Sequence, residues 1–156
     1  MKAAIFKKPG VIAVEERNKP TIENPGDAVV RIVRTCVCGS DLWWYRGIDS
    51  ERMAADSQIG HEGIGVVDAV GTEVTAFMPG DFVIIPFGLS CGTCANCRAG
   101  RQTNCTQGTW LGNSQSEYAY VPLANGSLTK IPDGKYTEEQ LASLLTLSDV
   151  MGTGYH

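Results

Sequence analysis

The segment CGTCANCRAGRQTNC has its cysteines in the spacing C-x-x-C-x-x-C-x7-C, at Cys91, Cys94, Cys97 and Cys105. Tetrahedral zinc takes four thiolates at about 2.3 Å, and two-residue gaps let a looping backbone bring successive sulfurs to one point. Gly92, Asn96 and Gly100 are expected to supply the turns of this loop. A metal site in this loop therefore constrains the fold more tightly than any other feature of the sequence.

The metal predicted for this loop is a structural zinc, because four thiolates fill the coordination shell and leave no position for water or substrate. Two alternatives for the cysteines stay open, namely disulfides in an exported domain and an iron–sulfur cluster. The N-terminal stretch MKAAIFKKPG lacks the long apolar segment of a secretory signal, which disfavours disulfides. No other sequence feature suggests electron transfer, which disfavours the cluster.

Composition limits the class of protein. With 156 residues and 43% hydrophobic content, the chain has the size of one domain and can bury a core of its own. The formal net charge is -4 and no block of basic residues occurs, so no nucleic-acid partner is expected. Since no apolar run approaches the roughly 20 residues of a membrane span, we expect a cytoplasmic protein that does not enter a membrane.

Short segments rich in Val and Ile recur along the chain and are bounded by Gly, Pro, Asn or Asp. They are KAAIF, VIAVEE, DAVVRIVRT, GIGVVDAV, DFVIIP, YAYVP and LTKIP. Many short strands at close spacing are typical of a β-barrel or sandwich. One mainly β domain is predicted over residues 1–136, with the zinc loop at 91–105 as part of it.

Residues 137–156 form the only segment with a clear helical pattern. Thr137 and Gln140 fit a capping box, in which each side chain satisfies a free backbone N–H of the first helical turn, and LASLLTL follows.

A second candidate metal site begins at the segment GHEGIGVVDAVG. His61 and Glu62 stand directly before a predicted strand in which Gly63, Gly65 and Gly71 allow close backbone approach. Taken alone, the His-Glu pair indicates little, because a histidine at a strand end is more often a hydrogen-bonded structural residue than a ligand.

Four motifs in order give this pair a context: Cys-Gly-Ser-Asp at 38–41, Gly-His-Glu at 60–62, the cysteine loop at 91–105 and Leu-Ser-Asp-Val at 147–150. In this order they resemble the N-terminal catalytic domain of the zinc-dependent alcohol dehydrogenases of the medium-chain dehydrogenase/reductase family. The resemblance runs from KAAIF to the closing TGYH. It implies a barrel similar to the GroES co-chaperonin, with short helices and a C-terminal helical segment.

The resemblance implies two Zn2+ ions per chain, one catalytic and one in the cysteine loop. It makes Cys38, His61 and Asp149 ligands of the catalytic zinc, with Glu62 either a ligand or a close neighbour. Ser40 resembles the hydroxyl that hydrogen-bonds the substrate oxygen and passes its proton outward. On position alone, Asp149 could be a surface helix carboxylate and Ser40 could satisfy backbone groups in a turn.

Two residues near Cys38 in the sequence, Cys36 and Asp41, also have predicted roles. Asp41 is expected to orient a zinc ligand, His61, through a hydrogen bond. Cys36 lacks partners of this kind and is predicted to be a buried thiol.

The reaction implied by the resemblance is oxidation of an alcohol to an aldehyde or ketone, with hydride transfer from a zinc-bound alkoxide to NAD or NADP. Polyol, threonine and formaldehyde oxidation remain open within the family, as does the choice of cofactor. The partners implied are a small-molecule substrate and, for the parent enzyme, further copies in a homodimer or homotetramer.

Trp43 departs from the family pattern. Many relatives have a histidine there that forms the outer end of the proton relay, and an indole cannot carry a proton. The relay is then expected to run through a cofactor ribose, water or another residue. Trp43, Trp44 and Trp110 could line an apolar substrate pocket or belong to the core.

The chain also lacks the G-x-G-x-x-G turn of the nucleotide-binding domain that follows this segment in the family. Residues 1–156 are therefore expected to be part of a dehydrogenase and to bind zinc without turnover by themselves. Two other functions stay open: a non-catalytic zinc-binding scaffold and an interaction module resembling GroES.

Overall fold

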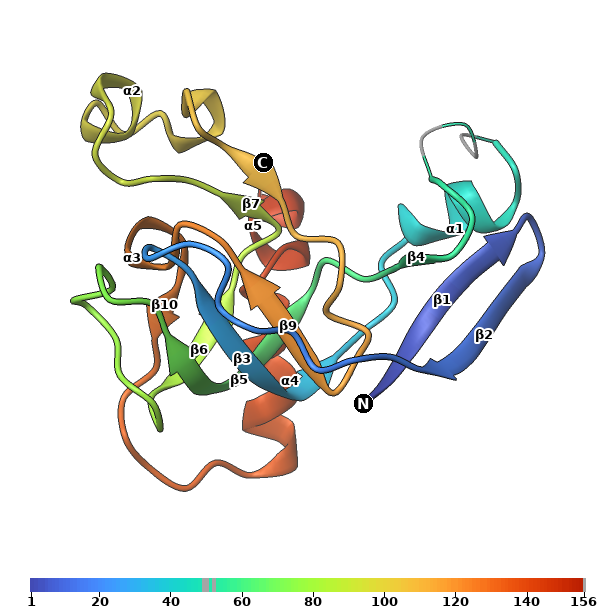
Figure 1. Cartoon of the computed structure of the whole chain (residues 1–156), viewed down its shortest axis with the longest axis horizontal. Coiled ribbons are helices and arrows are strands. Elements are labelled where there is room, and N and C mark those ends of the chain that lie inside the picture. Colours follow the sequence, from blue (N-terminus) through green and yellow to red (C-terminus); the bar gives the residue numbers. More distant parts are fainter. Residues whose placement is uncertain (49–50, 52, 156) are drawn as a thin grey trace.

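The computed structural model describes residues 1–48, 51 and 53–155, and most of its regular structure is antiparallel sheet (Figure 1). The strands are β1 (Lys2–Lys8), β2 (Val11–Glu16), β3 (Ala28–Thr35), β4 (Ser57–Gln58), β5 (Gly63–Val70), β6 (Phe82–Ile85), β7 (Gly88–Leu89), β8 (Thr109–Trp110), β9 (Tyr118–Val121) and β10 (Thr129–Lys130). The helices are α1 (Asp41–Tyr45), α2 (Ala95–Arg98), η2 (Gln102–Asn104), α3 (Ala124–Ser127), α4 (Glu138–Thr146) and α5 (Val150–Tyr155).

The predicted mainly β fold with short helices and a helical C-terminal segment is confirmed. Each of the seven predicted strand segments contains a strand, although LTKIP contributes only Thr129–Lys130. The last residue of the predicted helical segment, His156, lies outside the described residues. No helix among the described residues is long and apolar enough to cross a bilayer.

The central sheet has the strand order β10-β6-β5-β3-β9. Its middle strand, β5, pairs antiparallel with β3 over a register that runs from Ala28 opposite Val70 to Thr35 opposite Gly63. The close approach predicted for Gly65 is confirmed, because a Cβ there would lie 2.3 Å from the carbonyl oxygen of Arg31. Smaller sheets with the orders β2-β1-β4 and β7-β8 flank this one.

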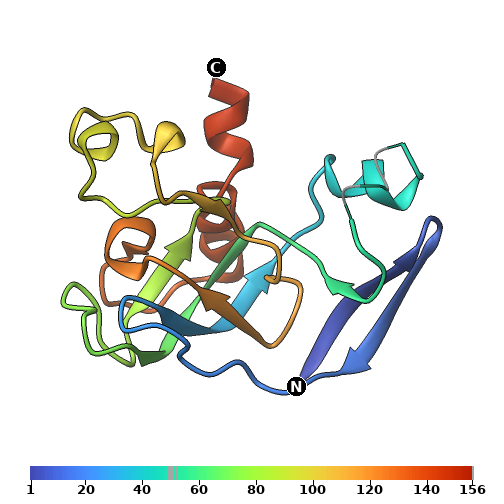
Figure 2. The ribbon, with the colours of Figure 1, turned by 45° about the horizontal axis from the view of Figure 1, so that its top comes forward.

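The central sheet buries both faces. Side chains alternate across a strand, so Val83 and Ile85 of β6 enter the larger core while Ile84 between them enters a second cluster with Ile64 and Leu145. Leu145 belongs to α4, which lies against the sheet and continues into α5 at the C-terminal end (Figure 2).

The predicted capping box of α4 is confirmed. The backbone N–H of Gln140 donates to Thr137 Oγ1 at 3.3 Å, and the Thr137 N–H donates to Gln140 Oε1 at 2.9 Å. These two bonds satisfy N–H groups that a helix start would otherwise leave free, so α4 begins where the sequence predicts it.

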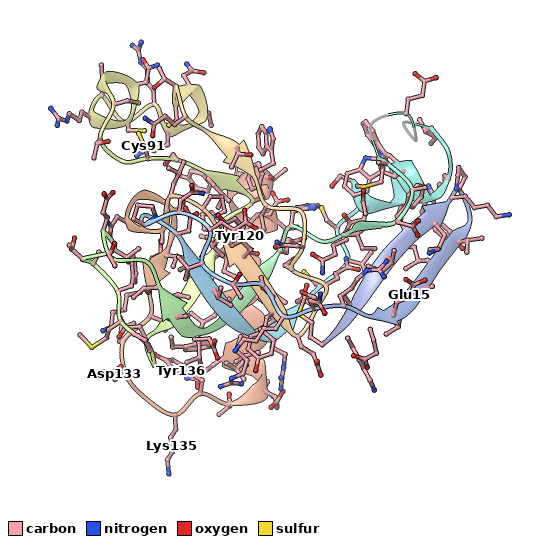
Figure 3. All side chains as sticks on the ribbon, in the orientation of Figure 1. Glu15, Cys91, Tyr120, Asp133, Lys135 and Tyr136 are labelled. Carbon is pink, nitrogen blue, oxygen red and sulfur yellow. The ribbon has the colours of Figure 1, made fainter. Side chains whose placement is uncertain are left out.

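The cysteine loop forms a lobe that projects away from the strands, and its Cys91 lies on the opposite side of the molecule from Tyr136 (Figure 3). Gly92 and Gly100 have φ angles of 71° and 75°, as expected for turn residues. The turn role predicted for Asn96 is wrong, because Asn96 lies within α2 and its Nδ2 donates to the carbonyl of Asn104 at 2.6 Å.

Candidate metal centres

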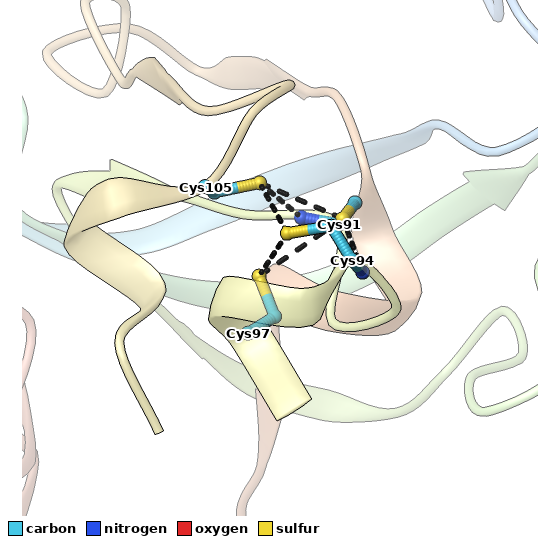
Figure 4. Close-up of side chains that lie close together, drawn as sticks. All are labelled: Cys91, Cys94, Cys97 and Cys105. Atoms are coloured by element: carbon cyan, nitrogen blue, oxygen red, sulfur yellow. Dashed lines mark hydrogen bonds between the residues drawn. The ribbon is translucent and has the colours of Figure 1, made fainter. Parts of the chain in front are cut away.

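The four cysteines of the lobe point their sulfurs toward one common centre (Figure 4). Neighbouring sulfurs lie 3.5 to 4.0 Å apart, and all six cysteines of the chain are free thiols. A tetrahedron with metal–sulfur bonds of about 2.3 Å has edges of about 3.8 Å, so the four sulfurs fit a zinc ion. Disulfides would need sulfurs about 2.05 Å apart and are not formed here.

Backbone amides prepare this cluster for a cation. The N–H groups of Cys97 and Thr106 lower the pKa of the Cys94 thiol to about 5, and hydrogen bonds from Thr93 lower that of Cys91 to about 7. Burial acts in the opposite direction on Cys97 and raises its pKa to about 11. Thiolates are the form that binds zinc, so the first two cysteines are prepared as ligands.

Helix α3 anchors the start of the lobe through two serines. The Ser90 N–H donates to Ser127 Oγ at 3.0 Å, and Ser127 Oγ donates to the Ser90 carbonyl at 3.2 Å. Gly126 makes this contact possible, since a Cβ there would lie 2.4 Å from backbone atoms of Cys91 and Gly92. This anchor was not predicted from the sequence, because ANGS reads locally as an ordinary turn.

The second group of possible ligands comes from three distant parts of the chain: Cys38 follows β3, His61 and Glu62 precede β5, and Asp149 lies between α4 and α5. Each offers a ligand atom within 4.8 Å of the others. Asp149 Oδ2 lies 3.2 Å from His61 Nε2 and 3.7 Å from Cys38 Sγ. The structure therefore brings together all four residues predicted at the catalytic zinc.

The buried carboxylate of Glu62 indicates that a cation fits this group. Its side chain is fully buried, and neither carboxylate oxygen has a partner in hydrogen-bonding geometry. An unpartnered buried carboxylate is costly, and a cation at the centre of the group would offset that cost. Neighbouring Cys36 is half-buried rather than fully buried, and burial together with the Glu62 carboxylate raises its pKa to about 12.

Asp41 contacts the His61 ring on the side opposite Asp149. Asp41 Oδ1 lies 3.2 Å from His61 Nδ1, while Asp41 Oδ2 accepts from the Cys38 N–H at 3.0 Å and from Gln115 Nε2 at 3.2 Å. The buried Asp41 carboxylate raises the pKa of His61 to about 9. The position of Asp41 agrees with its expected place, whereas Gln115 was not predicted from the sequence.

Ser40 lies at the open side of the group. Its Oγ is 3.4 Å from His61 Nε2, and it makes no side-chain capping bond at the start of α1, so the turn alternative has no support here. Beside it is a cleft of about 450 Å³ that Trp43 and Trp110 help to line. Trp43 is 56% exposed and Trp110 is 70% exposed, so neither ring belongs to the core.

Comparison with known proteins shows the family of the chain. The family model "Alcohol dehydrogenase GroES-like domain" matches residues 24–133. The chain belongs to this GroES-like alcohol dehydrogenase family. Zinc-type alcohol dehydrogenase B of Aspergillus flavus is 38% identical over 99% of the chain and 36% of its own length. Medium chain reductase/dehydrogenase ucsI of Acremonium sp. is 35% identical over 99% of the chain and 53% of its own length.

Solved structures agree with this GroES-like alcohol dehydrogenase assignment. An alcohol dehydrogenase from Thermus sp. ATN1 superposes with a TM-score of 0.88 at 33% identity, over 99% of this chain and 46% of that one. The chain thus spans about a third to a half of the length of these relatives.

Proposed function

We propose that this chain is the catalytic-domain portion of a zinc-dependent, NAD(P)-linked alcohol dehydrogenase, which oxidises an alcohol to an aldehyde or ketone by hydride transfer. By themselves, residues 1–156 bind zinc without turnover, because the chain carries no glycine-rich turn for the nucleotide. The full-length enzyme acts as a homodimer or homotetramer.

The convergence of the four ligand atoms next to an open cleft carries this proposal. Cys38, His61 and Asp149 would hold a catalytic zinc, with Glu62 as a further ligand or a close buried carboxylate. The set combines a thiolate, an imidazole and carboxylates, and three protein ligands leave a position for substrate. A zinc ion held there would act as a Lewis acid and lower the pKa of an alcohol hydroxyl.

Residues around the reacting hydroxyl would transfer its proton and orient the histidine ligand. Ser40 Oγ, exposed at the cleft, would accept the hydroxyl proton through a hydrogen bond and pass its own proton outward. Trp43 cannot extend that path, so the proton leaves Ser40 to water or to a cofactor hydroxyl. Asp41 would keep His61 oriented, with Nε2 turned toward the metal and Nδ1 turned toward the carboxylate.

The four cysteines of the lobe would hold a second, structural zinc. A closed set of four thiolates stabilises the loop and leaves no site for substrate. The competing function is a zinc-binding scaffold without catalysis, which would need this lobe alone.

Zinc content separates the two functions. Inductively coupled plasma mass spectrometry of the purified chain should give two zinc ions per chain. A content of one zinc that resists every change at Cys38, His61 or Asp149 would favour the scaffold instead.

A further inference from the structure

Three tryptophans, Trp43, Trp44 and Trp110, line the cleft beside Ser40 and His61. The cleft holds about 450 Å³ and continues into a smaller hollow of about 260 Å³ that Asp149 and Phe87 help to line. Ser40, Trp44 and His61 line both hollows, so one continuous space leads to the metal group. A substrate whose hydroxyl reached the metal group would place its remaining atoms in the larger hollow.

The larger hollow offers very few polar contacts. Among the described residues that line it, Ser40 and His61 have polar side chains at the reacting end, and the tryptophans add only indole N–H donors, with no acceptor. The described lining contains no carboxylate, amine or amide. Extra hydroxyl groups of a substrate would therefore lose water without gaining hydrogen-bond acceptors, which is unfavourable. This chemistry disfavours polyols.

Flat rings supply half of the described apolar side chains of the larger hollow, Trp43, Trp44 and Trp110, and the other half are Met53, Ile59 and Leu111. Trp44 and Phe87 each meet the His61 ring edge-on, at centroid distances of 6.4 and 6.5 Å. Trp110 stacks on Phe87 at 5.5 Å with an interplanar angle of 13°. Trp43 and Trp110 are more than half exposed, so much of their ring surface is uncovered in this structure. Aromatic rings attract one another through stacked and edge-to-face contacts beyond simple area burial.

We propose that this cleft selects alcohols whose carbinol carbon carries a flat aromatic ring, over polyols and over aliphatic alcohols of similar size. The inference rests on the proposed function, since it places the substrate hydroxyl at the metal group. Trp110 and Trp43 are the specificity-determining residues, with the substrate ring stacked on or meeting their indoles. This preference would narrow the substrates from alcohols in general to arylmethanols.

The test is a fluorine NMR titration of 4-fluorobenzyl alcohol into the zinc-loaded chain, with cyclohexylmethanol and xylitol as unlabelled competitors. Cyclohexylmethanol has a similar size but no flat ring, and its dissociation constant should be about 2- to 13-fold higher than that of the 4-fluorobenzyl alcohol probe. Xylitol should not displace the probe at tenfold higher concentration. Displacement by xylitol as effective as that by cyclohexylmethanol would overturn the proposal.

Variants link the preference to the rings. Trp110→Leu keeps an apolar side chain but removes the flat surface, so 4-fluorobenzyl alcohol and cyclohexylmethanol should bind to it with equal affinity. Trp43→Ala should raise the dissociation constant of 4-fluorobenzyl alcohol several-fold. Tyr45→Ala changes an exposed aromatic on the same helix as Trp43 that does not line the cleft, and it should bind like the parent. Parent-like selectivity in both tryptophan variants would also overturn the proposal.

Zinc content measured on the same samples keeps this inference separate from the proposed function. Two zinc ions together with no aromatic preference would refute the inference and leave the proposed function standing. An aromatic preference in a chain whose single zinc is retained in Cys38→Ala would support the ring contacts in the cleft and contradict the proposed function.

Discussion

His61 Nδ1 lies 3.2 Å from Asp41 Oδ1, on the opposite side of the ring from Asp149. The imidazole is therefore held between two carboxylates, one buried behind it and one in the candidate metal group. Asp41 also receives the Cys38 N–H, so a single carboxylate positions two of the proposed ligands.

Asp41→Asn is expected to weaken zinc binding at the Cys38–His61–Asp149 group by about 10- to 100-fold, because the ring loses the charge that orients it. Chelator competition at fixed pH measures the affinity. Asp68→Asn is the control, since Asp68 pairs with Lys19 instead. Unchanged affinity in Asp41→Asn, or equal loss of zinc from the cysteine lobe, would contradict the positioning role.

Gly126→Ala is expected to destabilise the cysteine lobe, because the new Cβ would meet the Cys91 and Gly92 backbone at 2.4 Å. Overpacking of this kind costs about 1–3 kcal/mol, and the loss should appear as faster release of the structural zinc to a chelator. Gly26→Ala serves as the control, since a Cβ there meets nothing within 4 Å. Identical zinc release in the two variants would show that Gly126 does not support the lobe.

Thr137→Ala is expected to lower the free energy of unfolding by about 0.5–2 kcal/mol, because the Gln140 N–H loses its acceptor. Urea denaturation measures the change. Ser143→Ala, in the middle of α4, should change stability by less than the cap variant, since alanine is the better helix former. A larger loss in Ser143→Ala would argue against the capping box as a source of stability.

Asp81 should make stability depend on pH. A hydrogen bond from Lys130, helped by the Met78 N–H, lowers the pKa of Asp81 below 3.8 in the folded protein. A lowered carboxyl pKa stabilises the fold above the ordinary pKa, and that stabilisation is lost as the pH falls through the folded-state value. Asp81→Asn should therefore lower the Tm at pH 7, and its Tm difference from the parent should shrink as the pH falls below 3.8. Glu23→Gln changes an exposed side chain and is the control, so its Tm should equal that of the parent at every pH. If the Tm difference between Asp81→Asn and the parent did not change with pH, this linkage would be excluded.

Local patterns predicted much of this fold. Strand β5 occupies the predicted segment GIGVVDAV, and α4 starts at its predicted cap, because alternation and capping are properties of neighbouring residues. The short helix α2 was missed, and Asn96 was placed in a turn, because four helical residues leave no periodic pattern to detect.

The candidate site also has a part that the sequence predicts and a part that it does not. The ligand residues could be selected from motif order, but their convergence depends on the packing of β3, β5 and the turn before α5, which no local pattern reports. Gln115 and Gly126 act through residues that are distant along the chain, so the sequence around each gives no signal of its contact.

The central claim is that the chain holds two independent zinc sites, one in the cysteine lobe and one at Cys38, His61 and Asp149. Zinc content of three single variants tests it most directly. Cys38→Ala and His61→Ala should each retain one zinc and a folded chain, whereas Cys94→Ala should lose the lobe zinc and keep the other. Equal loss of both metals in all three variants would contradict two independent sites.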